Sequence, residues 1–308
     1  MPFACLIVNP KAGGNSAFAS RLDEMTRVLN FHGFAAQAVE TTSAPHSARD
    51  LARRASDAAD LVIACGGDGT VHGVVQGVAN TRACLGVLPF GTANALARNL
   101  GLPLDPVAAL QRLLQFKTTE IPLGVARNST GNGIEERWFT VMAGAGPDGR
   151  LIHEMKLSAK PKTGRVTYYA QAGRLFATRR FRPFRTEYRI TGSSTWESRT
   201  VVAMMASRVP DLGGLFRGLT SHSRLHHPHL LAQLVTGPAH LAFPAWFAFG
   251  KTGLGNRNPW VTSVNVEELI CTPLDNRSET FSQVDGEAFG AIPMSLGIVN
   301  NALRMLMP

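Results

Sequence analysis

The stretch LVIACGGDGT brings together residue types that bind phosphate groups. Its first residues are aliphatic without polar alternation, which is typical of a strand covered on both faces of a sheet. Gly66, Gly67 and Gly69 follow, and glycines allow backbone N–H groups to turn inward and approach an anion closely. Thr70 opens a helix-like run and is predicted to be its N-cap. The order strand, glycine-rich loop and helix N-terminus predicts a phosphate-binding loop.

Asp68 lies inside this loop. A carboxylate beside a phosphate is repulsive unless a cation lies between them, so the aspartate predicts a bound Mg²⁺ ion. The loop is not a P-loop, because no Gly-Lys-Ser/Thr follows at the required spacing. A tight structural turn without a ligand is the alternative interpretation.

A second pair of carboxylates stands near the C-terminus in SQVDGEAFG. Asp285 and Glu287 flank one glycine, so in an extended segment both side chains would point to the same face. Two adjacent carboxylates allow one to face a metal or donor while the other accepts a proton, as phosphoryl transfer to a hydroxyl requires. A simple Asp-Gly β-turn is the alternative.

The segment AGAGPDG satisfies the pattern G-x-G-x-x-G through Gly144, Gly146 and Gly149. The dinucleotide-binding version of this pattern expects an acidic residue about 20 positions later. None occurs between Glu154 and Glu187, so dinucleotide binding is not expected here.

Four histidines cluster in SHSRLHHPHL. Histidine-rich runs can bind metal, but Pro228 and the lack of a nearby cysteine or carboxylate favour a loop.

Residues 1 to about 120 alternate short apolar strands with amphipathic helices. The predicted strands are FACLIVN, FAAQAVE, LVIACGG and CLGVLPF, and the predicted helices include AFASRLDEMTRVLNFHG and SARDLARRASDA. This alternation predicts a parallel sheet covered by helices on both faces. The loops NPKAGG, GGDGT and PFGTAN would then follow carboxyl ends of strands, where such sheets bind ligands.

From about residue 121 the pattern changes to short alternating segments, which predict an antiparallel β domain. These segments are RWFTVMAG, RTEYRITG, RTVVAMMAS and SVNVEELICT, and the final ALRML is expected to return to the first domain. The apolar segment PAHLAFPAWFAFG is too short to span a membrane, and either a packed helix or an interfacial element is expected.

The composition describes a globular protein of 308 residues with four scattered cysteines and a net charge of +9. Residues 150–260 hold 17 Lys and Arg against 4 Asp and Glu, which indicates a negatively charged partner or simply a solvated basic face. The N-terminus lacks the features of a signal peptide, so a reducing, cytoplasmic location is expected, with peripheral association at the inner membrane face as an option.

Taken together, the motifs resemble the diacylglycerol kinase catalytic-domain superfamily, especially its bacterial lipid kinases and sphingosine kinase-like members. The resemblance runs through LIVNPKAGG, TTSAPHSARDLA, GGDGT, GVLPFGTANALARNLGLP, AGAGPDG, TGRVTYY and VDGEAFG, in the order of the family. GGDGT alone is shared with NAD kinases and phosphofructokinase-like enzymes, and the other motifs favour the lipid kinase branch. The implied fold is an α/β nucleotide-binding domain like that of NAD kinase and diacylglycerol kinase, followed by a β-sandwich, with the active site between them. The predicted domains are 1–120 with a return at about 296–308, which binds ATP, and 121–295, which binds the lipid.

The resemblance also implies roles for individual residues. The implied ATP-binding residues are Asn9, Thr42, Gly66, Gly67, Asp68, Gly69, Thr70, Gly91, Thr92 and Asn94. Asp68 would lie near the phosphates and Mg²⁺, Glu287 would act as the base toward the lipid hydroxyl, and Asp285 would assist it.

The chain departs from the family pattern at several acidic positions. Gly73, Ala95 and Pro122 stand where relatives often carry acidic residues, and LHHPHLL replaces an Asp-Gly pair that supports a structural Mg²⁺ in several bacterial relatives. A second metal is therefore not expected in this chain.

These observations predict an ATP-dependent lipid kinase that phosphorylates a diacylglycerol- or sphingoid-like lipid at a membrane surface. The alternatives are a kinase of a soluble acceptor, such as an NAD kinase-like enzyme, and a non-catalytic lipid-binding member of the family. Nucleic acid is not an expected partner, since no recognition motif accompanies the charge. A homodimer is an open option.

Overall fold

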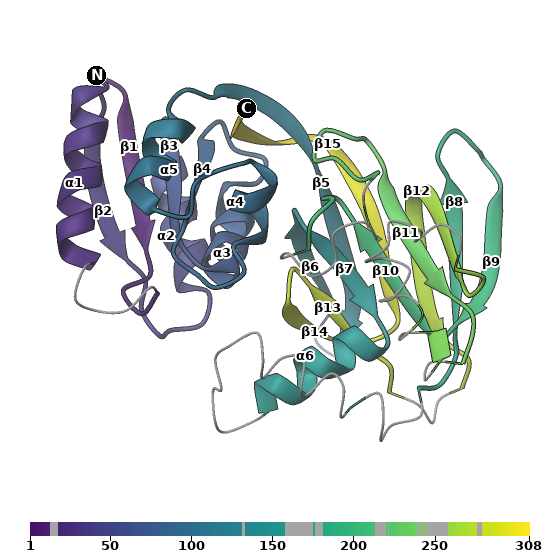
Figure 1. Ribbon diagram of the computed structural model, residues 1–308. Coiled ribbons are helices and arrows are strands. Elements are labelled where there is room, and N and C mark those ends of the chain that lie inside the picture. Colours follow the sequence, from purple (N-terminus) through teal and green to yellow (C-terminus); the bar gives the residue numbers. More distant parts are fainter. Residues whose placement is uncertain are drawn as a thin grey trace. The chain divides into compact units, whose positions relative to one another are not determined.

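The computed structural model of this chain describes residues 1–12, 18–130, 133–157, 175, 181–212, 220, 222–238, 241, 242, 245, 258–275 and 279–308. The chain forms two compact units, one made of Met1–Leu123 with Asn300–Pro308 and the other of Gly124–Val299 (Figure 1). It passes from the first unit to the second within strand β5 (Lys117–Thr130) and returns within strand β15 (Met294–Met307).

The first unit is built on a parallel sheet in the order β15, β4, β3, β1, β2. Its strands are β1 (Phe3–Val8), β2 (Ala35–Glu40), β3 (Leu61–Gly66) and β4 (Cys84–Pro89), and the C-terminal strand β15 places Arg304 opposite Cys84. Every residue of β3 and β4 is buried, as their continuous apolar sequences predict. The predicted α/β fold with a parallel sheet is confirmed.

The helices described in this unit are α1 (Phe18–Phe31), α2 (Ser47–Ser56), α3 (Asp68–Val78), α4 (Ala95–Asn99) and α5 (Pro106–Leu113). Helices α2 and α3 approach closely at glycines of α3: a Cβ at Gly73 would lie 2.8 Å from the Cβ of Ala48, and one at Gly77 would collide with the carbonyl of Arg49. The glycine at position 73, a departure from the family pattern, therefore has a packing reason.

The second unit consists mainly of antiparallel strands, which confirms the predicted fold class of this part. They are β6 (Gly133–Phe139), β7 (Met142–Ala145), β8 (Phe184–Ile190), β9 (Trp196–Val201), β10 (Ala203–Ser207), β11 (Leu230–Val235), β12 (Val261–Pro273), β13 (Phe281–Val284) and β14 (Glu287–Ala291), with helix α6 (Pro147–Leu157) after β7. The neighbours run β14, β13, β7, β10, β11, β12, β15, and the β8–β9 hairpin pairs with β12. Phe139, Phe184, Tyr188 and Phe289 are the largest side chains of the core that these strands enclose.

Two predicted strands are each divided in the structure. The segment RWFTVMAG is interrupted between β6 and β7 at Thr140 and Val141, and RTVVAMMAS is interrupted between β9 and β10 at Val202. The first interruption has a specific cause, because the backbone there turns toward the side chain of Asp285.

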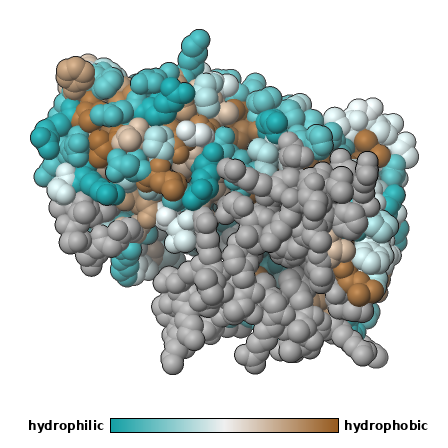
Figure 2. Space-filling model, in the orientation of Figure 1, coloured by the Kyte–Doolittle hydropathy of each residue, from teal (hydrophilic) through white to brown (hydrophobic). Residues whose placement is uncertain are grey.

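No helix among the described residues is long and apolar enough to cross a membrane. Most of PAHLAFPAWFAFG lies outside the described residues, so its predicted packing stays a prediction. All four cysteines are buried free thiols. On the face shown in Figure 2, the hydrophobic residues of the described part are interspersed with hydrophilic ones.

Candidate active site

The predicted nucleotide-binding residues of the first unit follow the carboxyl ends of its parallel strands. Asn9 follows β1, Thr42 follows β2, the GGDGT run begins at the end of β3, and the PFGTAN run follows β4. Since these four strands are neighbours and point the same way, their carboxyl ends share one edge of the sheet. The structure thus gathers all ten of these residues at that edge.

Thr70 is not the N-cap of the helix that follows the glycine loop, so that prediction is wrong. Helix α3 begins at Asp68, and its N-cap is Gly67 in an extended conformation, without a side-chain cap. Thr70 lies in the first helical turn, where its side chain packs over Gly66 and leaves no room for a Cβ there. Its Oγ1 accepts a hydrogen bond from Asn9 Nδ2 (3.2 Å), which joins the loop after β1 to the helix.

The two glycine loops of the site, the GGDGT run after β3 and the PFGTAN run after β4, are in contact. A Cβ at Gly91 would lie 2.5 Å from the Cα of Gly67, so the loops require glycine to approach this closely. Asn94 stabilises the loop after β4. Its Oδ1 accepts from the Gly91 N–H and its Nδ2 donates to the Gly91 carbonyl, both at 2.8 Å. The Phe90 N–H donates to the carbonyl of Gly66 (3.1 Å) and completes the connection.

Asp68 joins the same loops through its carboxylate. Its Oδ2 accepts from the backbone N–H of Asn94 (3.0 Å) and its Oδ1 from that of Ala95 (2.7 Å). These are the first N–H groups of α4, which begins after Asn94 in a left-handed conformation (φ 48°). Asp68 therefore caps α4 from the first residue of α3, a structural role that its sequence position did not reveal.

Two of the three threonines predicted to contact ATP, Thr42 and Thr92, lie at the surface, whereas Thr70 is buried. Thr42 is exposed and its Oγ1 accepts from the Ala44 N–H (3.2 Å), while Thr92 and Gly69 are also exposed.

The donor set of the first unit fits a Mg²⁺ ion that arrives with a nucleotide. Among the described residues, no group of three or more His, Cys, Asp or Glu side chains is placed to hold a metal ion. Mg²⁺ commonly uses one or two carboxylates and takes its other ligands from phosphate oxygens and water, an arrangement that a single aspartate can serve. Ligation of the ion by Asp68 stays a prediction.

In the second unit, Asp285 and Gly286 form the two-residue turn between β13 and β14. Both have positive φ (50° and 84°), with Val284 paired to Glu287, which is the geometry of a type I′ hairpin. The Asp-Gly β-turn considered as an alternative is therefore present. The segment is not extended, so the alternation that would place both carboxylates on one face does not apply to it.

The Asp285 carboxylate is surrounded by backbone donors. It accepts from the N–H groups of Thr140 (3.0 Å), Val141 (2.9 Å) and Met142 (2.9 Å), and the Thr140 hydroxyl lies 3.4 Å from it. Two of these donors lie in the interruption between β6 and β7 and the third, Met142, is the first residue of β7, so Asp285 fixes the turn to this part of the chain.

Arg208, at the end of β10, was not singled out from the sequence. Its side chain is fully buried and donates to the carbonyls of Leu225 and His227, so it anchors part of the histidine-rich loop. Burial lowers the pKa of its guanidinium to about 10, while the charge of Asp285 acts in the opposite direction. Arg208 is therefore a buried cation that interacts electrostatically with Asp285. The histidine run itself forms turns ahead of β11, which confirms the predicted loop.

Gln283 and Asp148 were also missed. Gln283 Oε1 accepts from the Gly286 N–H (2.8 Å), and its Nε2 donates to Asp148 Oδ2 (3.1 Å), so the amide bridges the hairpin turn to the start of α6. Burial raises the pKa of the Asp148 carboxyl to about 6, and the hydrogen bond from Gln283 opposes this effect.

This bridge also explains the AGAGPDG pattern. A Cβ at Gly144 would collide with Asp148, and one at Gly149 would collide with the backbone of Phe281. The glycines bring α6 against β7 and β13, which is a packing role.

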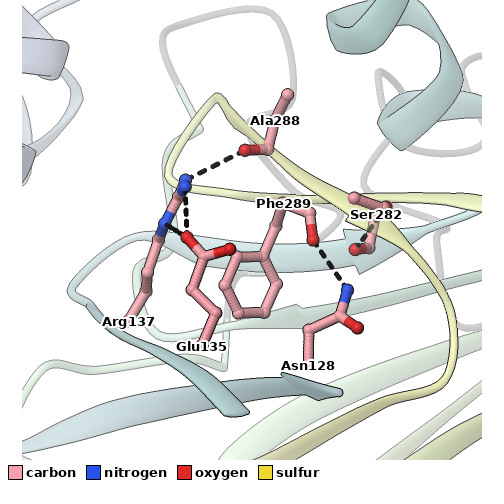
Figure 3. Close-up of polar contacts among 7 residues, drawn as sticks. Asn128, Glu135, Arg137, Ser282, Ala288 and Phe289 are labelled. Carbon is pink, nitrogen blue, oxygen red and sulfur yellow. Dashed lines mark hydrogen bonds and ion pairs between the residues drawn. The ribbon is translucent and has the colours of Figure 1, made fainter. Parts of the chain in front are cut away.

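Glu287 is exposed on β14, next to the turn. Its strand is held by side chains from neighbouring elements, as Figure 3 shows. Asn128 Nδ2 donates to the carbonyl of Phe289, and Arg137, paired with Glu135 (2.6 Å), donates to the carbonyl of Ala288. An exposed carboxylate on a fixed strand can accept a proton from a bound alcohol.

Comparisons with known proteins agree with this architecture. Residues 3–126 match the family model of the diacylglycerol kinase catalytic domain. A diacylglycerol kinase from Bacillus subtilis is 32% identical over 193 residues, covering 61% of this chain and 60% of that protein. One from Staphylococcus saprophyticus is 28% identical over 187 residues, covering 60% of this chain and 58% of that protein. The matched region thus spans about 60% of the length of these curated relatives.

Solved structures show the same fold over nearly the whole chain. A diacylglycerol kinase structure from Bacillus anthracis has a TM-score of 0.70 at 19% identity and covers 99% of this chain and 96% of that one. Yeast NADH kinase complexed with NADH has a TM-score of 0.54 at 11% identity and covers 100% of this chain and 84% of that one.

Proposed function

We propose that the chain is an ATP-dependent lipid kinase, because residues 3–126 match the family model of the diacylglycerol kinase catalytic domain and relatives named diacylglycerol kinase are similar to it. It transfers the γ-phosphoryl group of ATP to a hydroxyl of a diacylglycerol- or sphingoid-like lipid. The observation that carries the proposal is the pair of glycine loops, held in contact by Asn94 and Asp68, within the part of the chain that matches this family.

In the proposed reaction, the first unit binds and orients the phosphates of ATP. Backbone N–H groups at the start of α3 and in the loop after β4 donate to phosphate oxygens and stabilise their negative charge. The close contact of Gly67 and Gly91 keeps both loops fixed, so the donors need no rearrangement during the reaction. Mg²⁺, when bound with ATP, supplies charge neutralisation at the phosphates, with Asp68 as its proposed protein ligand.

The second unit supplies the proton acceptor. Glu287 accepts the proton of the lipid hydroxyl as the new O–P bond forms, and ADP leaves with the electrons of the broken bond. Asp285 acts by fixing the turn that carries Glu287, since its carboxylate is bound to the backbone of Thr140, Val141 and Met142. We therefore assign Asp285 a positioning role in this reaction.

The acceptor can be identified by the phase in which the product is found. Labelled ATP with Mg²⁺ is incubated with mixed micelles of diacylglycerol, sphingosine, ceramide or monoacylglycerol, and separately with NAD. Label in the organic phase is expected, and the preferred lipid defines the substrate. Label only in the aqueous NAD product would instead identify a soluble-acceptor kinase, and no transfer despite ATP binding would indicate a non-catalytic protein.

A lipid acceptor also suggests peripheral membrane association through the basic segment, residues 150–260. Arg179 and Arg180 lie outside the described residues, whereas Arg182 and Arg185 are described and pair with Asp275 and Glu187, both at 3.5 Å. Substituting the four arginines by glutamine should weaken sedimentation with anionic vesicles, and unchanged sedimentation would refute this association.

A further inference from the structure

The backbone on both sides of Glu287 is held by side chains. Before it, the N–H of Gly286 donates to Gln283 Oε1 (2.8 Å). After it, the carbonyl of Ala288 accepts from Arg137 Nη1 (2.9 Å). Because the Glu287 side chain is exposed, its direction depends on this backbone and not on packing around the carboxylate.

Strand β14, which carries Glu287, needs such support because its own pairing is incomplete. Among the described residues it pairs only with β13, and the register shifts between Phe281 and Gln283, opposite the part of β14 where Gly290 has a positive φ (83°). In an antiparallel pair, alternate carbonyls point away from the partner strand, and at an edge no further strand binds them. Pairing with β13 therefore does not by itself fix the position of β14.

Arg137, on β6, is a rigid support for this edge. Its Nε and Nη2 lie 2.8 and 2.6 Å from Glu135 Oε1, and its guanidinium lies over the Phe289 ring, 5.1 Å from the centroid (Figure 3). These contacts orient the planar guanidinium, so that Nη1 is directed at the Ala288 carbonyl. The chain from Glu135 through Arg137 to Ala288 thus connects β6 with the peptide that follows Glu287.

We propose that Arg137, oriented by Glu135, is a positioning residue for Glu287 in phosphoryl transfer, an inference that rests on the proposed kinase function. By binding the Ala288 carbonyl, the guanidinium keeps the Glu287 carboxylate where it can accept the proton of the alcohol. Without this contact, ATP and the lipid still bind, but the carboxylate is in place in a smaller fraction of the bound complexes. The loss therefore falls on kcat and not on KM.

The same hairpin supplies a matched control. Arg127 on β5 pairs with Glu136 on β6 (2.8 Å), as Arg137 pairs with Glu135. Among the described residues, Arg127 makes no hydrogen bond with β14. Each arginine-to-alanine variant loses an ion pair of the β5–β6 hairpin, so a difference between the two variants reports on the contact with β14.

Steady-state kinetics of the full chain, with labelled ATP and Mg²⁺ and lipid in mixed micelles, test the proposal. Arg137→Ala should lower kcat about 10–100-fold and leave the KM values for ATP and lipid near those of the wild type. Arg137→Lys keeps one charged donor without the fork and should regain part of the rate. Arg127→Ala should keep the wild-type kcat.

The same substitution in a Glu287→Gln background separates positioning from a general distortion. If Arg137 acts through Glu287, Arg137→Ala should lower the residual rate of Glu287→Gln by less than about twofold, because the group that it positions is already absent. A distortion of the whole unit would instead multiply the two losses.

Hydrogen exchange of the peptide that contains β14 gives a readout without turnover. Exchange should be faster in Arg137→Ala and unchanged in Arg127→Ala. Thermal unfolding identifies any loss of fold, and Arg137→Lys carries the kinetic test if the alanine variant does not fold.

An active wild type whose folded Arg137 variants keep the full kcat would overturn this inference and leave the kinase function intact. Multiplied losses in the double variant would overturn it too. A wild type that transfers no phosphate to any lipid would refute the proposed function itself, and the role of Arg137 would fall with it.

Discussion

Asp68 in the first unit and Asp285 in the second occupy similar positions in their glycine-containing motifs, and both use the carboxylate to hold backbone N–H groups of a neighbouring segment. Asp68 binds two such groups at the start of α4, and Asp285 binds three at the interruption between β6 and β7. The sequence suggested chemistry for both residues. The structure gives each a structural task as well.

The two sites differ in what surrounds the aspartate. Around Asp68, two glycine loops lie in contact, and the proposed function assigns phosphate binding to their backbone N–H groups. Around Asp285, side chains from several elements accompany the backbone donors: Arg208 is buried and interacts electrostatically with Asp285, Gln283 bridges to Asp148, and Glu287 is exposed on the adjoining strand. The comparison favours phosphate binding at the first site and proton transfer at the second, as the proposed function requires.

The largest effect is expected from Asp285→Ala. This variant leaves three backbone N–H groups without their acceptor and removes a negative charge that interacts with the buried Arg208, which should lower the free energy of unfolding by about 3–5 kcal/mol. Denaturant unfolding measures the change. Asp285→Asn keeps one acceptor oxygen and tolerates the positive φ, so it should be less destabilised. Equal losses for alanine and asparagine would contradict the role of these hydrogen bonds.

Gly91→Ala tests the contact between the glycine loops. Its Cβ would lie 2.5 Å from the Cα of Gly67, a backbone atom that cannot move independently, so a loss of about 1–3 kcal/mol is expected together with weaker ATP binding. Gly297→Ala is the control, because the nearest atom, on Val125, would be 3.6 Å away. Calorimetric titration with an ATP analogue measures the affinity, and wild-type affinity for Gly91→Ala would show that the loop contact is unnecessary for binding.

Asp68→Ala separates capping from nucleotide binding when it is compared with Asp105→Ala. Asp105 Oδ1 caps α5 through the N–H groups of Val107 (3.1 Å) and Ala108 (3.0 Å), outside the candidate site. Each variant should lose about 1 kcal/mol of stability. Only Asp68→Ala should also lose affinity for ATP with Mg²⁺, and equal affinities for the two variants would remove Asp68 from the nucleotide site.

The smallest effect concerns Asp148 and pH. Its pKa is raised by burial from 3.8 to about 6, so the folded protein binds an extra proton between these values and the free energy of unfolding falls as pH rises through this window. Asp148→Asn keeps an acceptor for Gln283 and should remove this dependence, a change on the order of 1–2 kcal/mol. Denaturation at pH 4.5 and 7.5 measures it, and an unchanged pH dependence would assign the effect to another group.

The sequence predicted the first unit well because its signals are local. Apolar runs such as LVIACG mark buried parallel strands, and the following glycines mark the loops. The error at Thr70 arose because Gly67 begins the helix with no side-chain cap, which local preferences do not favour.

The sequence predicted less of the second site because its contacts are long-range. Gln283 and Asp148 are 135 positions apart, and Asp285 binds backbone groups more than 140 residues earlier. No spacing rule connects such residues. Asp285 lies in a turn with positive φ, so its side chain does not point where an extended strand would place it. Arg208 could have been noticed only as a charge beside an apolar strand.

The most direct test of the kinase assignment is the rate of phosphoryl transfer by Glu287→Gln at saturating ATP and lipid, with ATP affinity measured on the same preparation. Loss of the general base should lower kcat by about 10²–10⁴-fold. The ATP affinity should be unchanged, because the glycine loops belong to the other unit. A Glu287→Gln variant with the wild-type rate would contradict the assignment of Glu287 as the base.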